Sequence, residues 1–99
     1  MTKVFEIVKY KALTSVTDEE ILDVSTKLQE LVTSQKGLVS RTLAKSEDGE
    51  WIDVVIWESL EDAMKAAELI NTHPVGGEFM SKVQVETVTM KHYSFQQGF

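Results

Sequence analysis

The segment from Trp51 to Glu58 restricts the possible folds more than any other part of the chain. Its residues favour a β-strand, in which alternate side chains point to opposite faces of a sheet. Both faces would be apolar, because Asp53 is the one charged residue between the two ends of the segment. One row holds Ile52, Val54 and Ile56, and the other holds Trp51, Val55 and Trp57. Such a strand has to be covered on both sides.

Local signals define the elements that precede this strand. A first strand is predicted from Lys3 to Ala12, and Thr17-Asp18-Glu19-Glu20 has the pattern of a capping box, in which the Thr17 hydroxyl accepts from the Glu20 N–H. The helix that follows should run to about Gln35 and end with a basic turn and a glycine C-cap at Lys36-Gly37. Its apolar positions are Ile21, Val24, Leu28, Leu31 and Val32.

The remaining elements are predicted in the same way. Ser59 should cap a second helix, which ends near Asn71 because Pro74 disfavours helical geometry in the residue before it. The expected buried stripe of this helix is Leu60, Ala63, Met64, Ala67 and Ile70. The other segments are a strand over Leu38–Ser46, a hairpin turn at Glu47-Asp48-Gly49-Glu50, an irregular or helical piece over Val75–Lys82, a last strand over Val83–Ser94 and a tail over Phe95–Phe99.

The order strand, helix, strand, strand, helix, strand predicts a single α+β domain that spans residues 1–99. The leading way to fold this order with right-handed crossovers is the ferredoxin-like βαββαβ arrangement with a four-stranded antiparallel sheet. In that arrangement the first and third strands lie at the centre of the sheet.

A second copy of the chain is the predicted partner. Two helices cover only one face of such a sheet, yet the first strand also carries apolar residues on both sides: Phe5 and Ile7 oppose Val4, Val8 and Tyr10. A bare face with two Trp and several Val would be larger than monomers usually expose. We therefore expect a homodimer, with Trp51 as a partner contact or as partial cover.

Composition excludes several classes of function. The formal net charge of −6 disfavours nucleic acid as a partner, and without Cys the chain forms neither a disulfide nor a thiolate metal site. Charged residues interrupt every apolar run before it reaches the length of a signal peptide or a membrane span. These features predict a cytoplasmic protein that does not associate with membranes.

One stretch is similar to a known family. Val54-Val55-Ile56-Trp57-Glu58-Ser59-Leu60-Glu61-Asp62-Ala63, followed by a helix and by His73-Pro74 before Phe79, resembles the antibiotic biosynthesis monooxygenase-like domains of the dimeric α/β-barrel superfamily. The resemblance implies a dimeric α/β barrel. Related domains include cofactor-independent oxygenases of quinone-forming pathways, haem-degrading enzymes, isomerases and many proteins of unknown role.

The haem-degrading subgroup fits this sequence poorly. Its members use an Asn near the first strand, a Trp in the second helix and a His that ligates iron. The first strand here has no Asn, and the middle of the second helix reads Met64-Lys65-Ala66-Ala67. His73 alone could stand for the ligand, so no cofactor is expected.

Two residues are predicted as catalytic groups. His73 lies where the second helix ends, a position that in the family can border the cavity between helices and sheet, and imidazole can serve there as a general base or as a donor to a phenolic substrate. The alternative is a His favoured by the dipole of the helix C-terminus. Asp53 interrupts an apolar row, and in a poorly solvated cavity its pKa would be raised, which suits proton abstraction.

Three residues are predicted to contact the substrate. Trp57 resembles the strand-end Trp of the family and can stack on a flat aromatic ligand, or else it fills the core. Glu6 interrupts the first strand as Asp53 interrupts the third, and the alternative for both carboxylates is an ion pair with Arg41 or Lys9. Tyr10 is expected, with His92, near a strand end and partly exposed.

These observations give one leading hypothesis and two alternatives. The leading one is a homodimer with a ligand cavity in each subunit that acts as a cofactor-independent monooxygenase on a small aromatic or polyketide-like molecule. The alternatives are a non-catalytic ligand-binding or stress-related barrel and an isomerase or lyase. The His spacing does not favour a metal site, and no Gly-rich phosphate loop is present.

Overall fold

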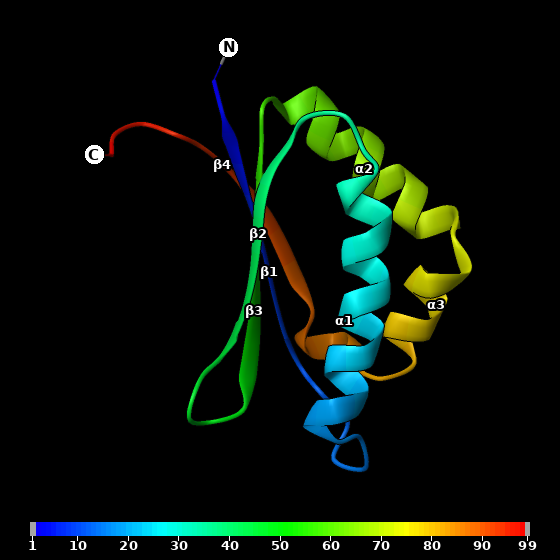
Figure 1. Cartoon of the computed structure of the whole chain (residues 1–99). Helices are drawn as coiled ribbons and strands as arrows, with labels where there is room; N and C mark the ends of the chain where they lie inside the picture. Colours follow the sequence, from blue (N-terminus) through cyan, green and yellow to red (C-terminus); the bar gives the residue numbers. More distant parts are fainter. Residues whose placement is uncertain (1, 99) are drawn as a thin grey trace.

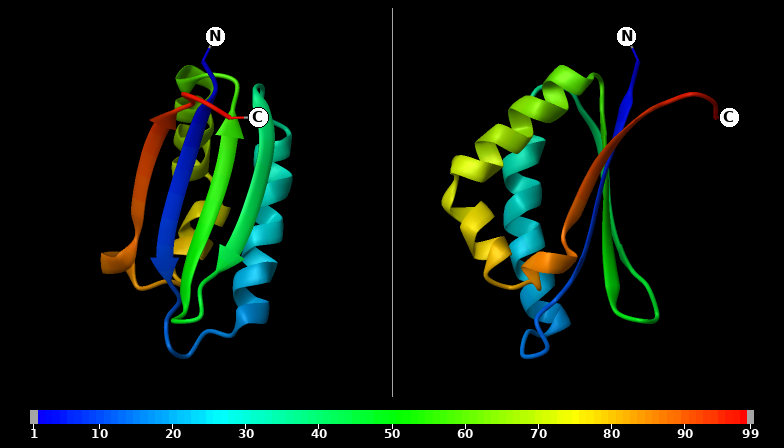
Figure 2. Two further views of the ribbon diagram at one scale, coloured as in Figure 1. Left: turned by 90° about the vertical axis from the view of Figure 1, so that its left-hand side faces the viewer. Right: turned by 180° about the vertical axis from the view of Figure 1, so that it is seen from behind.

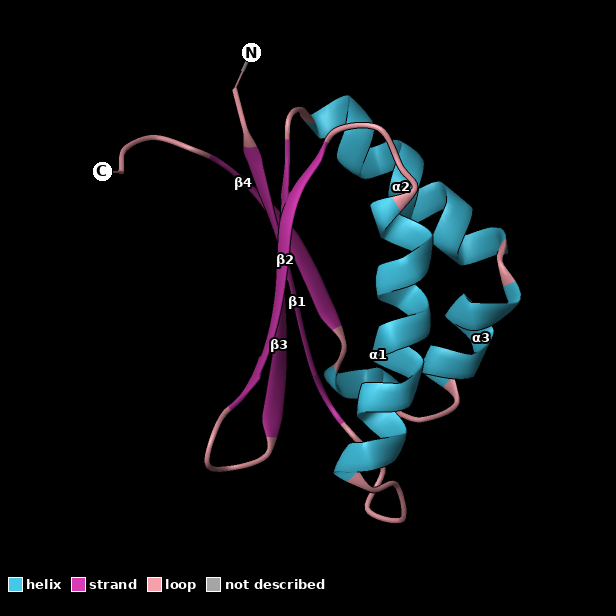
Figure 3. Cartoon of the chain, in the orientation of Figure 1, coloured by secondary structure: helices cyan, strands magenta, loops and turns pink. Residues whose placement is uncertain are grey.

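The computed structural model describes residues 2–98 and has two layers, with all the helices on one side of a single sheet (Figures 1 and 3). The elements are the strands β1 (Val4–Lys11), β2 (Leu38–Lys45), β3 (Glu50–Trp57) and β4 (Thr89–Ser94), the helices α1 (Asp18–Thr33), α2 (Leu60–Thr72) and α3 (Pro74–Met80), and a short 3₁₀ turn (Val85–Thr87).

The sheet has the strand order β2-β3-β1-β4, and every neighbouring pair is antiparallel. The ferredoxin-like prediction is confirmed, with β1 and β3 at the centre. The left view of Figure 2 looks onto the face of the sheet that no helix covers, and the helices lie behind it.

Side-chain caps start the two long helices as predicted. Thr17 and Glu20 form both halves of the capping box at α1, and the Ser59 hydroxyl accepts from the Asp62 N–H at 3.1 Å at α2. The side chain of His73 performs the same task for α3, because its Nδ1 accepts from the Val75 N–H at 3.1 Å. These local bonds fix where each helix begins over the sheet.

The ends of two elements differ from the prediction. α1 ends at Thr33 with Ser34 as its C-cap, so Gly37 is not the C-cap. Gly37 instead has a φ of +90° just before β2, and Gly49 has a φ of +92° in the β2–β3 turn. The last strand begins only at Thr89, because the preceding residues form the 3₁₀ turn.

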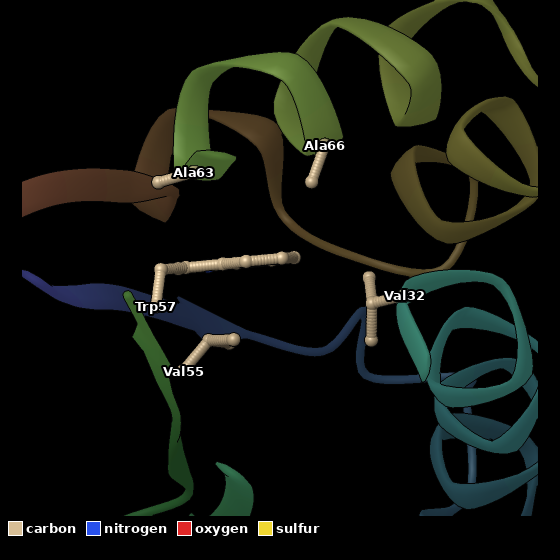
Figure 4. Packing of buried hydrophobic residues seen from close by; sticks show 5 residues of the cluster. All are labelled: Val32, Val55, Trp57, Ala63 and Ala66. Carbon is tan, nitrogen blue, oxygen red and sulfur yellow. The ribbon is translucent and has the colours of Figure 1, made fainter. Parts of the chain in front are cut away.

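The structure corrects which face of β3 lies under the helices. Trp51, Val55 and Trp57 are buried beneath α1 and α2, so the two Trp do not lie on the bare face and Trp51 is not a partner contact. Figure 4 shows the Trp57 ring between Ala63 and Ala66 of α2 on one side and Val55 on the other. Small residues on α2 make room for this flat ring.

The uncovered face is formed by the other rows. Its central residues are only partly buried within the chain: Phe5, Ile7, Ile52, Val54 and Ile56. The ring of Phe95 stacks on that of Phe5, with 6.3 Å between centroids, and Tyr93 remains 48% exposed beside them. An apolar face therefore remains without cover, although it is not the face that contains the tryptophans.

The buried side of α2 is also narrower than predicted. Ala63 and Ala66 are buried, but Leu60 and Met64 are 51% and 53% exposed. Helix periodicity places these two residues on a flank of α2 and not on its sheet-facing side.

Gly37 allows a direct test of how α2 is held against the sheet. A Cβ at this position would collide with the side chain of Asp62, whereas a Cβ at Gly49 would meet nothing within 4 Å. Both glycines have positive φ, which costs other residues about 1–2 kcal/mol. We expect Gly49→Ala to lower the free energy of unfolding by that amount and Gly37→Ala to lower it by about 1–3 kcal/mol more, as measured by urea denaturation. Equal losses in the two variants would show that the Asp62 contact is readily relieved.

Candidate functional site

Polar side chains separate two apolar clusters on the helix-facing side of the sheet. One cluster surrounds Trp57 and the other surrounds Trp51 and Tyr10. Between them, one cross-strand row consists of His92, Glu6, Val55 and Arg41, which we call the Glu6 row. The next row, two residues along each strand, consists of Met90, Val8, Asp53 and Leu43, which we call the Val8 row. Strand register brings these two rows together from all four strands.

Glu6 and His92 form a pair at the β4 end of the Glu6 row. The two residues face each other on β1 and β4, and His92 Nε2 lies 2.9 Å from Glu6 Oε2. The side chain of Glu6 is 11% exposed, and that of His92 is 21% exposed. If Nε2–H donates to the carboxylate, Nδ1 is left unprotonated and can accept a proton. The pair is therefore a carboxylate-oriented imidazole, an arrangement suited to a general base.

Asp53 forms a buried ion pair with Arg41. Arg41 Nη2 lies 2.7 Å from Asp53 Oδ2 and 3.0 Å from the Ser25 hydroxyl of α1. The two side chains are only 14% (Asp53) and 6% (Arg41) exposed. Burial raises the pKa of Asp53 above its ordinary value, while the Arg41 charge and hydrogen bond act in the opposite direction. The predicted alternative of an Asp53–Arg41 pair is confirmed, but Oδ1 of the same carboxylate has no hydrogen-bond partner within residues 2–98.

The β4 end of the Val8 row is more exposed than its Asp53 side chain. Met90 is 53% exposed on the helix-facing side of the edge strand β4, Val8 is partly exposed, and the Asp53 side chain is 14% exposed. Glu6 and Tyr10, the neighbours of Val8 that point to the same side of β1, are both buried. The row is thus exposed at Met90 on the edge strand β4, and its Asp53 carries a buried carboxylate oxygen without a partner among residues 2–98.

The exposed flank of α2 lies on the same side of the molecule as this opening. Asp62 packs against Gly37 at the start of β2. Leu60 and Met64 are each two positions from Asp62, or about 200° around the helix, so they point away from β2 and toward the β4 side. Leu60, Met64 and Met90 are thus three exposed apolar side chains on the β4 side of the molecule, which we call the apolar border.

The structure places Trp57 and Tyr10 in the core. Trp57 is 1% exposed and both faces of its ring are covered, although its Nε1 has no partner among the described residues. Tyr10 is 2% exposed, which corrects the expectation that it is partly exposed; its ring stacks on Trp51 and meets Phe79 edge-on at 4.9 Å. Burial and, to a lesser extent, the nearby Asp53 charge raise the pKa of Tyr10.

His73 is not brought together with the other predicted site residues. It is exposed at the corner between α2 and α3 and lines an open groove of about 490 Å³ between α1 and α3. Lys27, Leu31 and Glu78 line the same groove. Lys27 lies about 200° around α1 from Ser25, which contacts Arg41, so the groove faces away from the polar rows.

His92 is the functional candidate whose importance sequence reasoning missed. It is partly exposed as expected, with 21% of its side chain accessible, but its pairing with Glu6 was not expected. The one sequence signal for this role is that His92 is an ionisable residue within a predicted strand. The sequence does not reveal its partner Glu6, which lies 86 positions earlier. Within residues 2–98 no three His, Asp or Glu side chains are grouped to hold a metal ion. No helix in this part of the chain is long and apolar enough to cross a membrane.

Comparison with known proteins shows similarity in structure alone. No protein-family model matches the sequence, and no curated protein matches it. A candidate antibiotic biosynthesis monooxygenase from Bordetella bronchiseptica has a TM-score of 0.81 at 14% identity, with 100% of both chains covered. SnoaB, a cofactor-independent oxygenase from Streptomyces nogalater, has a TM-score of 0.72 at 14% identity, with 100% of this chain and 96% of that one covered. The chain has the fold of the antibiotic biosynthesis monooxygenase-like proteins.

Proteins with this fold differ in activity. Hydroxynitrile lyase from Passiflora edulis has a TM-score of 0.74 at 14% identity, with 98% of this chain and 96% of that one covered. An oxygenase and a lyase therefore share the monooxygenase-like fold with this chain, and at such low identity the likeness extends to the fold only. The function has to be inferred from the side chains.

Proposed function

We propose that the chain is a cofactor-independent monooxygenase that acts on a small aromatic or polyketide-like molecule, with the Glu6–His92 pair as its base. The observation that carries the proposal is this pair, which is partly buried and held at 2.9 Å, with the exposed apolar border on the same side of the molecule. The fold it shares with a cofactor-independent oxygenase supports the proposal. A cytoplasmic location stays a prediction from the sequence.

The chemistry requires little from the protein beyond a base and an environment poor in water. His92 Nδ1 takes a proton from an acidic CH₂ group of the substrate, and Glu6 stabilises the imidazolium that forms. The carbanion transfers one electron to O₂, and the resulting radical pair combines to a peroxide on that carbon. Loss of the second C–H proton then breaks the O–O bond. The sum is R₂CH₂ + O₂ → R₂C=O + H₂O, so the substrate supplies all the electrons.

Oxygen uptake with anthrone tests this proposal. We expect the protein to accelerate uptake in the presence of a chelator and without added flavin, with one O₂ consumed for each anthraquinone formed. A rate equal to that of the protein-free solution would overturn the proposal. Binding of anthrone without turnover would do so as well, since it would identify a ligand-binding protein.

We further propose that a second copy covers the open face of the sheet. The apolar residues Phe5, Ile7, Ile52, Val54 and Ile56 form a continuous surface there, because they lie on the two central strands with matched register. Covering an apolar area of several hundred Å² on each subunit contributes about 25 cal/mol per Å² before association costs. Within residues 2–98 no helix lies over this face, and the C-terminal tail crosses it only at one end, where Phe95 stacks on Phe5 (Figure 2).

Light scattering at micromolar concentration should therefore give twice the chain mass of 11.2 kDa. Val54→Glu places a charge at the centre of the open face and should give monomers. Met80→Glu is the matched control, because Met80 is 41% exposed on the helical side and its substitution should leave the dimer intact. A folded wild-type monomer would contradict this part of the proposal.

A further inference from the structure

The free oxygen of Asp53 indicates what kind of substrate the site accepts. We propose that Asp53 Oδ1 accepts a hydrogen bond from a hydroxyl group of the substrate, so that the site selects hydroxylated aromatic compounds over analogues without a donor. This inference rests on the proposed function and specifies the substrate class of the same site.

The first reason is the incomplete hydrogen bonding of a buried charge. Asp53 Oδ2 is bound by Arg41 at 2.7 Å, whereas Oδ1 is buried and without a partner among residues 2–98. A buried acceptor without a hydrogen bond loses the energy of its hydration, and an ionised acceptor loses more than a neutral one. Arg41 has its own further partners, Ser25 and Gln29, and its geometry is committed to Oδ2. Oδ1 therefore lacks a hydrogen bond that the hydroxyl of a bound substrate would supply.

The second reason is the position of Asp53 relative to the base. Val8 is directly opposite Asp53, while Glu6 is opposite Val55, so Glu6 and Asp53 are diagonal neighbours on adjacent strands. Diagonal neighbours have Cβ atoms about 7–8 Å apart. An aromatic ring system that lies over Met90 and Val8 would reach Asp53 with one edge and present another edge to His92. Its hydroxyl would then contact Asp53, and its acidic C–H would contact His92, which is hydrogen-bonded to Glu6.

The third reason is that no side chain among residues 2–98 donates a hydrogen bond to Oδ1. Tyr10 is near enough for the Asp53 charge to affect its pKa, but no hydrogen bond joins the two side chains. Ser25 receives its bond from Arg41. The apolar surroundings of Val8 and Leu43, which flank Asp53 on the neighbouring strands, supply no donor side chain.

Binding of paired probes tests the inference independently of turnover. The probes are 1-naphthol and 1-methoxynaphthalene, which have the same ring system but differ in the hydroxyl donor, and binding is followed by quenching of tryptophan fluorescence and by calorimetry. We expect the wild-type protein to bind 1-naphthol about 10- to 100-fold more tightly. In the double variant Arg41→Met/Asp53→Leu, which removes the acceptor without leaving a lone buried charge, the preference should fall to about two-fold or less.

Two further variants make the result specific. Asp53→Asn retains an oxygen acceptor but no charge, so it should keep a preference of only several-fold. Lys45→Met/Asp18→Leu is the matched control, because it removes another ion pair between β2 and α1, at 2.9 Å but on the surface. It should leave the wild-type preference unchanged.

Failure of this inference and failure of the proposed function give different experimental results. Equal binding of the two probes by the wild-type protein would overturn the hydroxyl selection but not the oxygenase, because anthrone turnover is measured separately. A preference that survives in the double variant would also overturn the role of Asp53. Absence of both binding and oxygen uptake would overturn the proposed function and this inference together.

Discussion

Replacement of His92 by Gln should lower kcat for oxygen uptake by about 10²- to 10⁴-fold, the usual contribution of a general base. The amide of Gln can still donate to Glu6, so the strand pairing and the packing stay close to those of wild type. It cannot take up a proton, so the first step loses its acceptor. KM for anthrone should change by no more than about three-fold, because the apolar border formed by Leu60, Met64 and Met90 is untouched. Steady-state oxygen uptake gives both constants.

Two other variants separate this assignment from its alternatives. Glu6→Gln should lower kcat by about 10-fold or more, since the carboxylate that stabilises the imidazolium is lost while its hydrogen bond at 2.9 Å can be retained. His73→Gln should leave kcat within about two-fold, because His73 faces the groove between α1 and α3. The reverse ranking of the two histidines would move the base to His73 and refute the role of the Glu6–His92 pair.

The fold was predictable because its determinants are local. The capping box at Thr17, the Ser59 cap and the Asp-Gly turn each involve residues within four positions of one another, and each forms in the structure. Given these elements, handedness rules leave few ways to connect them. The strand order follows from that restriction and not from any long-range signal.

The candidate site was less predictable because it depends on the register between strands and on which face of the sheet the helices cover. Alternation along β3 separates two apolar rows, but it does not say which row the helices cover; that is decided by the small residues Ala63 and Ala66, which admit the Trp57 ring (Figure 4). The Glu6–His92 pair depends on the register between β1 and β4. A last strand predicted to begin at Val83 leaves that register undetermined. Asp53 was found because a charge within an apolar row is visible in the sequence.

The second large effect is expected at Arg41, where substitution should destabilise the whole domain. Arg41→Met removes the partner of a carboxylate that is 14% exposed, and an unpaired buried charge costs about 3–5 kcal/mol. This is a large fraction of the stability of a small domain. The double variant Arg41→Met/Asp53→Leu should recover most of the loss, since an apolar pair of similar volume often replaces a buried ion pair at little cost. Urea denaturation of the two variants beside wild type measures both effects.

The pH dependence of the stability lost in Arg41→Met identifies the cause of that loss. Burial already holds the pKa of Asp53 above its ordinary value against the opposing effect of Arg41, so removal of Arg41 should raise the pKa further. A carboxyl group whose pKa is higher in the folded than in the unfolded state destabilises the fold as pH rises from the unfolded pKa, about 3.9, through the folded one. The penalty of Arg41→Met relative to wild type should therefore be small near pH 4, where Asp53 is protonated, and complete at pH 7 if the folded pKa lies between. A penalty that does not change with pH would assign the loss to the packing and hydrogen bonds of the guanidinium, including its contact with Ser25, and would leave the Asp53 charge without a role in stability.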